Sequence, residues 1–416
     1  MNCRPAAELV TIGTELLTGS TVNTNAAYLG RELTRLGFKV EHQVACPDEP
    51  YAIQSALREA LSRSKVIFVS GGLGPTPDDV TRECIADFFG VPLVFSNRQY
   101  RKICRHYRFR GKKVPALVKR EAYFPSNAEP VLNQFGIALG FVIEEKGSLL
   151  IVVPGVPGEL TRLFETRLRN FLRKKFPGLG PAQTLVVKTI GVSEPTIMKR
   201  LGTPFFSLGP FQFGIYPETG EVSIRIYADS SQIIQRVKRR ILRTLDSDVY
   251  SFSDETLEAV IGRRLQARRW TISVAESCTG GRIAEKITSL AGASSYFKGG
   301  VVAYHNDVKM DSLGVDPSVL TRSGAVSQAC AVAMARGVRR RMETTLGLAV
   351  TGIAGPTRGS SKKPVGLVCI AVADAHRSQA WEERFGGDRE QIQTRAAKKA
   401  LEYLWRWIEK KKSARF

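Results

Sequence analysis

Short apolar segments that end in glycine-rich turns and continue into helices recur along this chain, and this alternation limits the folds open to it. Residues 8–19 have the pattern of a buried strand that ends in a glycine-flanked turn. Residues 23–38 begin with capping Asn and Thr, repeat apolar residues at helical spacing and stop at Gly37. Strands that alternate with helices in this way predict an α/β fold with a parallel sheet.

The same alternation returns further along the chain. A strand and a helix at residues 39–64 lead into an apolar strand at 65–70 and a loop rich in glycine and proline. Residues 270–281 repeat the strand and glycine turn, and further apolar strands precede a basic helix at 394–412. Ligands of parallel sheets bind at the carboxyl ends of strands. We therefore expect a site after the first strands of each region.

The chain length and the positions of proline and glycine indicate several domains. Its 416 residues predict two to four domains. From about residue 184 to 228 the pattern changes to two strand candidates around a middle punctuated by proline and glycine, which predicts a small α+β insert. A polar connector then leads into the last region. We expect domains at 1–170, 180–250 and 254–412.

Basic residues outnumber acidic ones. The chain has 61 Lys and Arg against 39 Asp and Glu, a formal net charge of +22, which implies anionic partners or an unusually basic surface. Residues 98–120 hold ten Lys or Arg and no acid, and predict a basic helix and loop. Such runs are commonly solvated faces, so we expect nucleic acid to bind only nonspecifically, if at all.

Cysteine spacing and hydropathy exclude two classes of protein. Seven cysteines are scattered without a CxxC pair, which predicts free thiols and gives little support to a zinc site or a disulfide framework. No apolar run approaches the roughly 20 residues of a membrane helix, and the first residues have no signal-peptide core. We expect a cytosolic protein without a membrane partner.

The loop GGLGPTPDD at residues 71–79 has the composition of an anion site. Successive glycines let backbone N–H groups approach an anion, while Asp78 and Asp79 offer hard oxygen ligands to a divalent cation. This combination suits phosphate or pyrophosphate chemistry. The alternative is a plain turn whose Asp caps the next helix. Three polar residues at strand ends or helix starts are candidates for the same pocket: Glu15, Asn25 and Asp48.

The segment AESCTGG at residues 275–281 places a nucleophile at a strand-to-helix turn. Backbone N–H groups and the helix dipole at such a turn stabilise an anion. Ser277 is the first candidate, and its alternative role is to cap the following helix. Cys278 is a rival because thiolates are intrinsically stronger nucleophiles.

Several of these motifs occur together in one order. The chain contains IGTELLTG, GGLGPTPDDVT, NQFGIALGF and PGVPGEL, followed by AESCTGG, VVAYHNDVK and TGIAGP. With this set, residues 7–408 resemble the competence/damage-inducible CinA family. The resemblance implies an α/β protein with a parallel-sheet molybdopterin-binding-like domain, a small α+β KH-like insert and a C-terminal α/β CinA amidohydrolase domain. It also implies a homodimer.

For the N-terminal domain, the resemblance implies a hydrolase of ADP-ribose that uses a divalent metal ion such as Mg²⁺. A role with a molybdenum cofactor has less weight, because a shared fold does not assign a function. The implied nucleotide-binding residues are Gly71, Gly72, Gly74, Glu15 and Asn25, and the implied metal ligands are Asp78, Asp79 and Asp48.

For the C-terminal domain, the resemblance to nicotinamide mononucleotide deamidases implies release of ammonia and nicotinic acid mononucleotide, without a cofactor, in pyridine nucleotide recycling. Ser277 would be the nucleophile and Lys309 its partner, and a lysine base must be neutral, which requires burial or neighbouring positive charge. The other implied residues are Tyr304 and Thr351 for catalysis, and Ser294, Thr279, Gly280 and Arg389 for the substrate.

The chain departs from the family pattern at six positions: Leu139, Gly158, His305, Thr357, Arg358 and Gln393. The last four lie near the deamidase motifs, so they bear on substrate affinity more than on the chemistry. Two alternatives from other classes stay open: a nucleic-acid-associated factor of competence or damage response, and a scaffold whose catalytic sites have decayed. The middle region has no GxxG loop of the kind that nucleic-acid-binding KH domains use.

Overall fold

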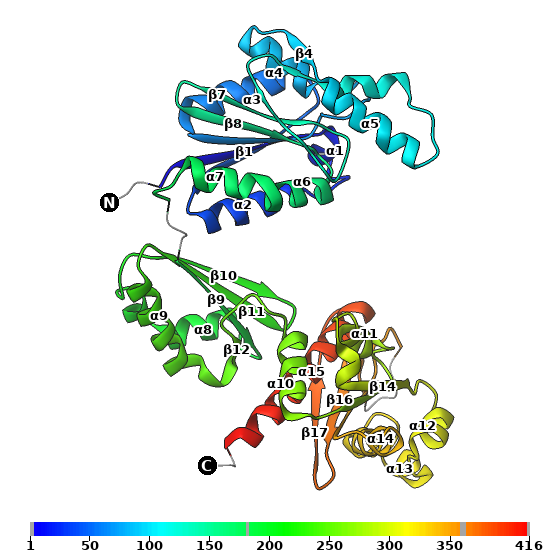
Figure 1. Ribbon diagram of the computed structural model, residues 1–416. Coiled ribbons are helices and arrows are strands. Elements are labelled where there is room, and N and C mark those ends of the chain that lie inside the picture. Colours follow the sequence, from blue (N-terminus) through cyan, green and yellow to red (C-terminus); the bar gives the residue numbers. More distant parts are fainter. Residues whose placement is uncertain (1–3, 180–182, 358–362, 414–416) are drawn as a thin grey trace. The chain divides into compact units, whose positions relative to one another are not determined.

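The computed structural model describes residues 4–179, 183–357 and 363–413, in two compact units, Met1–Ala182 and Gln183–Phe416 (Figure 1). The insert expected at 180–250 and the C-terminal region fall in the same unit, and the division into three domains stays a prediction. The six cysteines that the structure describes carry free thiols, as expected. Within the described ranges, no helix is both long enough and apolar enough to cross a membrane.

The first unit contains a six-stranded mixed sheet in the order β2-β1-β3-β8-β7-β6. Its strands are β1 (Ala6–Ile12), β2 (Lys39–Cys46), β3 (Val66–Ser70), β6 (Glu129–Val131), β7 (Gly140–Glu145) and β8 (Ser148–Val153). The first four strands in the order are parallel, whereas β7 pairs antiparallel with both β8 and β6, which corrects the expected parallel sheet. Lys146 and Gly147, both with positive φ, form a two-residue turn between β7 and β8, and such a turn joins only antiparallel neighbours.

Helices cover both faces of this sheet. The described helical segments are α1 (Thr14–Leu17), α2 (Thr24–Leu36), α3 (Pro50–Arg63), α4 (Thr81–Phe89), α5 (Asn97–Phe109), η1 (Ala116–Ala122), α6 (Pro157–Leu163), η2 (Phe164–Leu168) and α7 (Arg169–Lys175). Apolar residues of α2, α6 and α7 pack on one face, and those of α3 and α4 pack on the other. The short strands β4 (Leu93–Phe95) and β5 (Tyr123–Pro125) pair separately. The basic segment predicted at 98–120 forms α5 and most of η1.

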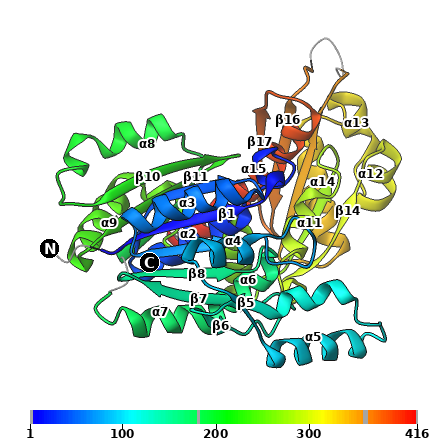
Figure 2. The ribbon, with the colours of Figure 1, turned by 90° about the horizontal axis from the view of Figure 1, so that it is seen from above.

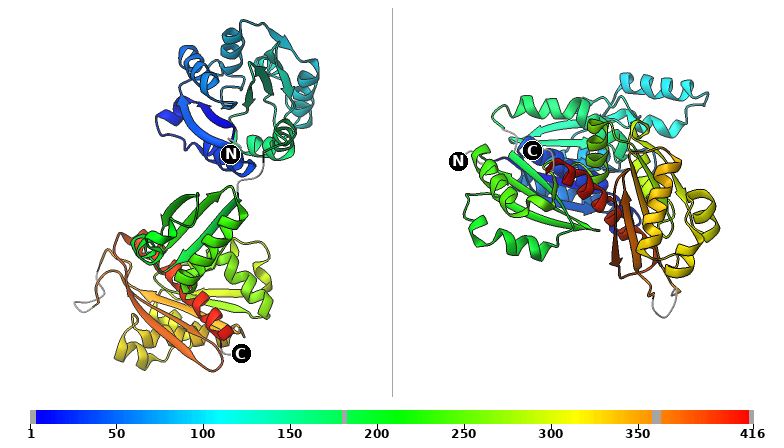
Figure 3. Two further views of the ribbon diagram at one scale, coloured as in Figure 1. Left: turned by 90° about the vertical axis from the view of Figure 1, so that its left-hand side faces the viewer. Right: turned by 90° about the horizontal axis from the view of Figure 1, so that it is seen from below.

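The second unit begins with a four-stranded antiparallel sheet in the order β10-β11-β9-β12 (Figure 3). Its elements are β9 (Gln183–Ile190), α8 (Glu194–Leu201), η3 (Thr203–Phe205), β10 (Gln212–Glu218), β11 (Glu221–Ala228), α9 (Ser231–Leu245), η4 (Asp246–Asp248) and β12 (Val249–Ser251). The apolar residues of α8 and α9 share one core with the strands. This arrangement is the expected α+β architecture, and its likeness to a KH domain stays a prediction.

The remainder of the second unit is built on a five-stranded sheet in the order β14-β13-β15-β16-β17. Its strands are β13 (Ile272–Glu276), β14 (Phe297–Val302), β15 (Leu346–Gly352), β16 (Leu367–Ala373) and β17 (Ser378–Arg384). The first three strands in the order are parallel and the last two antiparallel, so this sheet is mixed as well.

Two layers of helices enclose the five-stranded sheet. One layer contains α10 (Leu257–Arg268), α11 (Arg282–Thr288) and α15 (Arg389–Ser413), and the other contains α12 (Asn306–Leu313), α13 (Pro317–Ser323) and α14 (Gln328–Arg341), with η5 (Ala293–Ser295) before β14. Figures 1 and 2 both show α12, α13 and α14 gathered together. Because β13, β14 and β15 are parallel, the residues that follow their carboxyl ends meet at one edge of the sheet.

The antiparallel insert packs on the C-terminal helix. Lys398 of α15 pairs with Glu221 of β11 at 2.7 Å, and Arg406 pairs with Asp248 at 3.0 Å. The Arg406 guanidinium also donates to the Ser247 carbonyl at 2.8 Å. These contacts join the insert and the five-stranded sheet into one unit.

Candidate active sites

A cavity of about 250 Å³ lies where the three parallel strands of the C-terminal sheet end. It is lined by Ser277, Cys278, Tyr304, Asn306, Lys309, Ala325, Val326, Thr351, Gly352, Ala354 and Arg389. Five side chains predicted from widely separated motifs therefore meet here: Ser277, Tyr304, Lys309, Thr351 and Arg389. They come from the ends of β13, β14 and β15 and from the starts of α12 and α15.

A buried carboxylate holds the turn that carries Ser277. Glu276 accepts hydrogen bonds from the backbone N–H groups of Gly281, Ile283 and Ala284 at 2.8–3.1 Å. It thereby satisfies donors at the start of α11, where negative charge also suits the helix dipole. The N-cap residue of α11 is Gly281, so the alternative in which Ser277 caps this helix is wrong.

The turn leaves two amides without an acceptor. The N–H of Gly280 donates to the Ser277 carbonyl at 3.2 Å, so it is not open to an oxyanion as we expected. In the described part of the chain, no other residue accepts from the N–H groups of Cys278 and Thr279, and the Cys278 N–H meets only its own thiol. Thr279 and Gly280 do not belong to the cavity lining.

Lys309 is buried, with 2% of its surface exposed. Its Nζ donates to the carbonyl oxygens of Ala303 at 2.8 Å and Tyr304 at 3.3 Å. Burial lowers the pKa of the Lys309 amine, and only thiolate charge on Cys330 or Cys278 would raise it again. Burial also raises the pKa of both thiols, which keeps them uncharged near neutral pH. The structure thus supplies the burial that a neutral lysine base requires.

Cys278 lies under the turn and is less suited to attack than its neighbour. Burial raises the pKa of its thiol to about 12. A nucleophilic cysteine needs a thiolate, and this environment disfavours one.

Arg389 and Tyr304 form a pair at the mouth of the cavity. Arg389 donates from Nη2 to the Tyr304 hydroxyl and from Nη1 to the Gly355 carbonyl, both at 2.6 Å. Tyr304 is 60% exposed, and its hydroxyl keeps its own proton for a second hydrogen bond. The Thr351 hydroxyl donates to the Ala325 carbonyl at 2.8 Å and so ties the end of β15 to the segment before α14.

Ser294 is not brought to this cavity. It lies exposed in η5, before the amino end of β14, whereas Tyr304 follows the carboxyl end of that strand. Since the two ends of a strand lie on opposite edges of a sheet, Ser294 and the cavity are separated within this chain.

Two residues near the turn, Asn306 and Glu276, were not among the predicted site residues. Asn306 lines the cavity, and Glu276 anchors the turn. Gln393, one of the departures from the family pattern, donates to the Cys278 carbonyl at 2.8 Å and accepts from Arg282 at 3.3 Å. The acidic residue directly before SCTGG could have indicated Glu276 as the anchor of the turn. Nothing in the sequence pattern indicated that Gln393 contacts the turn.

The other departures have separate outcomes. His305 caps α12, accepting from the Asp307 N–H. Leu139 is buried in the first unit, and a side chain at Gly158 would meet open space. Thr357 is exposed, and Arg358 lies outside the described residues.

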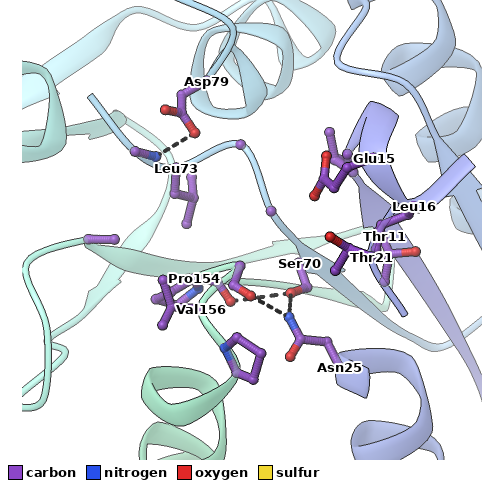
Figure 4. Close-up of a pocket in the computed structure, with 18 of the residues that line it drawn as sticks. Thr11, Glu15, Leu16, Thr21, Asn25, Ser70, Leu73, Asp79, Pro154 and Val156 are labelled. Atoms are coloured by element: carbon purple, nitrogen blue, oxygen red, sulfur yellow. Dashed lines mark hydrogen bonds between the residues drawn. The ribbon is translucent and has the colours of Figure 1, made fainter. Parts of the chain in front are cut away.

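A second cavity, of about 440 Å³, lies at the carboxyl ends of the parallel strands in the first unit (Figure 4). All eight residues predicted for this site line it: Glu15, Asn25, Asp48, Gly71, Gly72, Gly74, Asp78 and Asp79. Asn25 donates to the Ser70 hydroxyl at 3.0 Å and to the Gly155 carbonyl at 2.7 Å, and Figure 4 shows this side chain pointing at Ser70. Ser70, Glu121 and Glu159 also line the cavity and were not predicted.

The glycine loop is held by Asp79. Its carboxylate accepts from the N–H groups of Gly74 and Thr76 at 2.8 and 2.9 Å, and from the Thr76 hydroxyl. Gly71 has a φ of 115°, and a Cβ there would collide with the Ile12 carbonyl. The N-cap residue of α4 is Val80 and no side chain caps that helix, so the alternative in which an Asp caps it is wrong.

The acids of this cavity do not fit a metal centre built from protein ligands alone. Among the residues that the structure describes, no three His, Cys, Asp or Glu side chains gather to hold a metal ion. Asp79 is engaged by the loop, and Asp48 accepts from the Thr14 N–H and hydroxyl at 2.8 and 3.1 Å. Asp78 is exposed, and a hydrogen bond from Thr76 lowers its pKa. The assignment of these three acids as metal ligands stays a prediction.

Comparisons with known proteins agree in both units. Residues 254–408 match the family model described as "CinA C-terminal domain", and residues 8–174 match "Probable molybdopterin binding domain". The chain is 38% identical over 410 residues to a "CinA-like protein" of a Cyanothece species, covering 96% of this chain and 98% of that protein. It is 39% identical over 403 residues to a "CinA-like protein" of Salinibacter ruber, covering 95% and 98% of the two chains.

Among solved structures, the chain is similar to a CinA protein of unknown function from Thermoplasma acidophilum. The two are 34% identical, with a TM-score of 0.38, and the match covers 40% of this chain and 98% of that chain. The full-length relatives carry the family assignment. The chain belongs to the CinA family of competence/damage-inducible proteins, with an N-terminal molybdopterin-binding-like domain and a C-terminal CinA domain.

Proposed function

We propose that the C-terminal domain hydrolyses the carboxamide of nicotinamide mononucleotide to nicotinic acid mononucleotide and ammonia. The observation that carries this proposal is the single cavity that Ser277, Lys309, Tyr304, Thr351 and Arg389 share. A hydroxyl nucleophile beside a buried amine is an arrangement that serves acyl transfer. This arrangement favours an active enzyme over a decayed scaffold.

The reaction balances with these groups alone. The Ser277 hydroxyl attacks the carboxamide carbon and its proton passes to the neutral Lys309 amine. Breakdown of the tetrahedral intermediate breaks the C–N bond, and the Lys309 ammonium returns the proton to the departing nitrogen, which leaves as ammonia. Water then attacks the acyl-serine ester, again losing a proton to Lys309, which gives the acid and restores the Ser277 hydroxyl.

The neighbouring groups have supporting roles in this scheme. The N–H group of Cys278 is the candidate for stabilising the tetrahedral oxyanion, because Cys278 lines the cavity and no other residue in the described part of the chain accepts this N–H. Two carbonyls receive N–H bonds from the Lys309 amine, which leaves the lone pair of its neutral form to accept a proton. Arg389 is suited to the nucleotide phosphate because its planar fork matches phosphate oxygens.

Ammonia release from nicotinamide mononucleotide by the purified full-length chain tests this proposal. We expect turnover without added metal or cofactor, measured with a coupled ammonia assay and by chromatography of the product. Nicotinic acid mononucleotide, which lacks the scissile C–N bond, is the negative control. A chain that folds but releases no ammonia would support the decayed-scaffold alternative.

A second candidate function belongs to the N-terminal domain. We propose that its cavity binds a nucleotide with a diphosphate, of the class of ADP-ribose, for hydrolysis of the pyrophosphate bond. The specific observation in favour is the glycine loop, held open by Asp79, in a cavity of about 440 Å³. The described acids do not form a closed metal site, so no step of this hydrolysis is assigned to a metal ion.

A further inference from the structure

One carboxyl oxygen at the N-terminal cavity has no hydrogen-bond partner in the described part of the chain. Glu121 of η1 lines the cavity, yet only 2% of its surface is exposed. Its Oε2 atom is shielded from solvent and makes no hydrogen bond within the described part of the chain. A buried polar atom left unpaired is destabilising and rare in folded proteins, so such an atom next to a cavity points to a ligand that pairs with it.

The charged neighbours of Glu121 are only partly engaged by other residues. Arg82 of α4 is buried and donates from Nη2 to the carbonyls of Leu73 and Gly74, which anchors the glycine loop, while its Nη1 atom makes no hydrogen bond within the described part of the chain. Asp79 accepts from the loop amides, and Glu159 of α6 accepts from the Asn133 amide at 2.5 Å. Asp79 and Glu159 are thus engaged by other residues, while Glu121 contributes an uncommitted oxygen to the wall of the cavity.

This setting favours the neutral carboxyl. Burial raises the pKa of Glu121 to about 7, with further raising by the carboxylates of Glu159 and Asp79 and an opposing effect of Arg82. A neutral carboxyl is a hydrogen-bond donor, whereas a carboxylate only accepts. Phosphate diester oxygens only accept and carry negative charge, so they pair with the first form and are repelled by the second.

We propose that Glu121 is a ligand-binding residue of this cavity and donates the O–H of its neutral carboxyl to a phosphate oxygen of the bound nucleotide. The proposal rests on the diphosphate nucleotide suggested above for the N-terminal domain, and goes beyond it by naming a donor that the loop motif does not contain. The alternative contact, in which ionised Glu121 accepts from a sugar hydroxyl, predicts the opposite dependence on pH.

The wild-type protein provides the first test. ADP-ribose is a suitable probe because its phosphates are esterified and have no second ionisation near pH 6. Its binding to the full chain is measured by calorimetry at pH 6 and pH 8, with a chelator present so that the probe is not consumed. If only neutral Glu121 binds, the competent fraction changes from about 90% to about 10%, and the affinity falls about tenfold between these pH values.

Three variants separate the carboxyl from its surroundings. Glu121→Gln keeps the shape and a permanent donor, so we expect wild-type affinity at pH 6 and no loss at pH 8. Glu121→Ala removes the donor and should bind about tenfold more weakly than wild type at pH 6. Glu129→Gln, an exposed acid on β6, is the matched control and should behave as wild type.

The outcomes are distinct. Wild type that binds ADP-ribose equally at both pH values, with Glu121→Gln and Glu121→Ala unchanged, overturns the role of Glu121 and leaves the nucleotide proposal standing. Affinity that rises with pH in wild type but not in Glu121→Gln assigns the residue to a sugar hydroxyl and overturns it too. Wild type that does not bind ADP-ribose at either pH overturns both proposals. If Glu121→Ala does not fold, the glutamine variant and the wild-type profile decide the matter.

Discussion

Burial shifts the pKa values of two groups near the proposed nucleophile in opposite directions. Removal from water disfavours the ammonium form of Lys309 and equally disfavours the thiolate form of Cys278. The same environment therefore creates a base and suppresses a competing nucleophile. Ser277 needs no ionisation of its own, since its proton leaves as it attacks.

Replacement of the two adjacent nucleophile candidates distinguishes them. We expect Ser277→Ala to lower the rate of ammonia release by at least about 10³-fold, because no other group then forms the acyl intermediate. Cys278→Ala should keep most activity and lose about 1 kcal/mol of stability through lost packing. Rates and urea unfolding of both variants are compared. Normal turnover by Ser277→Ala together with an inactive Cys278→Ala would identify the thiol as the nucleophile.

The pH profile of deamidation should report Lys309. Because the neutral amine is the base, kcat/KM is expected to rise with pH as Lys309 loses its proton, with an apparent pKa below its ordinary value of 10.5. Lys309→Arg keeps a cation that cannot be deprotonated and should be inactive at every pH. Lys309→Ala should also be inactive while remaining folded. A profile that is flat from pH 6 to pH 9 would contradict this role.

Glu121 should also affect stability in a pH-dependent way. Its folded-state pKa is raised from 4.5 to about 7, so the folded state carries no penalty below pH 4.5 and the full penalty above about pH 7. Glu121→Gln removes the ionisation. Relative to wild type, its stability advantage should therefore grow between pH 5 and pH 8, by up to about 3 kcal/mol. Urea unfolding at the two pH values measures this difference, and equal differences at both would disprove the linkage.

At the scale of elements, both cavities depend on a carboxylate that organises a turn. Glu276 satisfies the first N–H groups of α11, and Asp79 satisfies the N–H groups of the loop between β3 and α4. In each case the acid fixes backbone donors that would otherwise be unpaired. The nucleophile turn and the glycine loop are thereby preorganised before a ligand arrives.

The two neighbouring aspartates of the glycine loop should consequently differ. Asp79→Asn loses an acceptor for the Gly74 or Thr76 N–H, and we expect a loss of about 1–3 kcal/mol and weaker ADP-ribose binding. Asp78→Asn changes an exposed side chain and should stay within about 0.5 kcal/mol of wild type. Deamidation should be unchanged in both. Equal effects of the two substitutions on stability would argue against Asp79 as the organiser of the loop.

At the scale of the whole molecule, the net charge of +22 is not explained by the few basic residues at the two cavities. Basic residues line the exposed side of α5 and the ends of α9 and α14, and such surfaces attract polyanions by releasing counterions. This attraction does not depend on the base sequence of a nucleic acid. It is compatible with an enzyme whose substrates are nucleotides.

Binding of single-stranded nucleic acid is therefore expected to be weak and steeply dependent on salt. Fluorescence anisotropy with labelled oligonucleotides of different sequence, measured from about 50 to 200 mM salt, should give parallel lines of log affinity against log salt concentration. Substitution of three α5 arginines, Arg98, Arg101 and Arg105, should reduce the slope. Binding that selects one sequence and persists at physiological salt would favour the nucleic-acid-associated alternative.

The sequence by itself determined the elements and most of the candidate residues. Helical periodicity and Gly37 set the limits of α2, and the motifs at strand ends located both sites, because a strand, a turn and a helix depend mainly on neighbouring residues. The parallel strands then bring those ends to one edge. Ser277 was therefore a candidate from its own turn, whereas Lys309, Tyr304 and Thr351, up to 74 residues away in the chain, were expected from the resemblance to the CinA family.

Only the tertiary structure decided the reversed direction of β7 and β16, the exclusion of Ser294 from the cavity and the partners of the acids. Local pattern treats Asp78 and Asp79 alike, yet one is exposed and the other is enclosed by loop amides. In the sequence, Glu121 is an ordinary polar residue that follows the basic segment 98–120. Its pKa is raised by burial and by the carboxylates of Glu159 and Asp79, which lie about 40 residues away on either side, and desolvation is a property of what the fold places around a group.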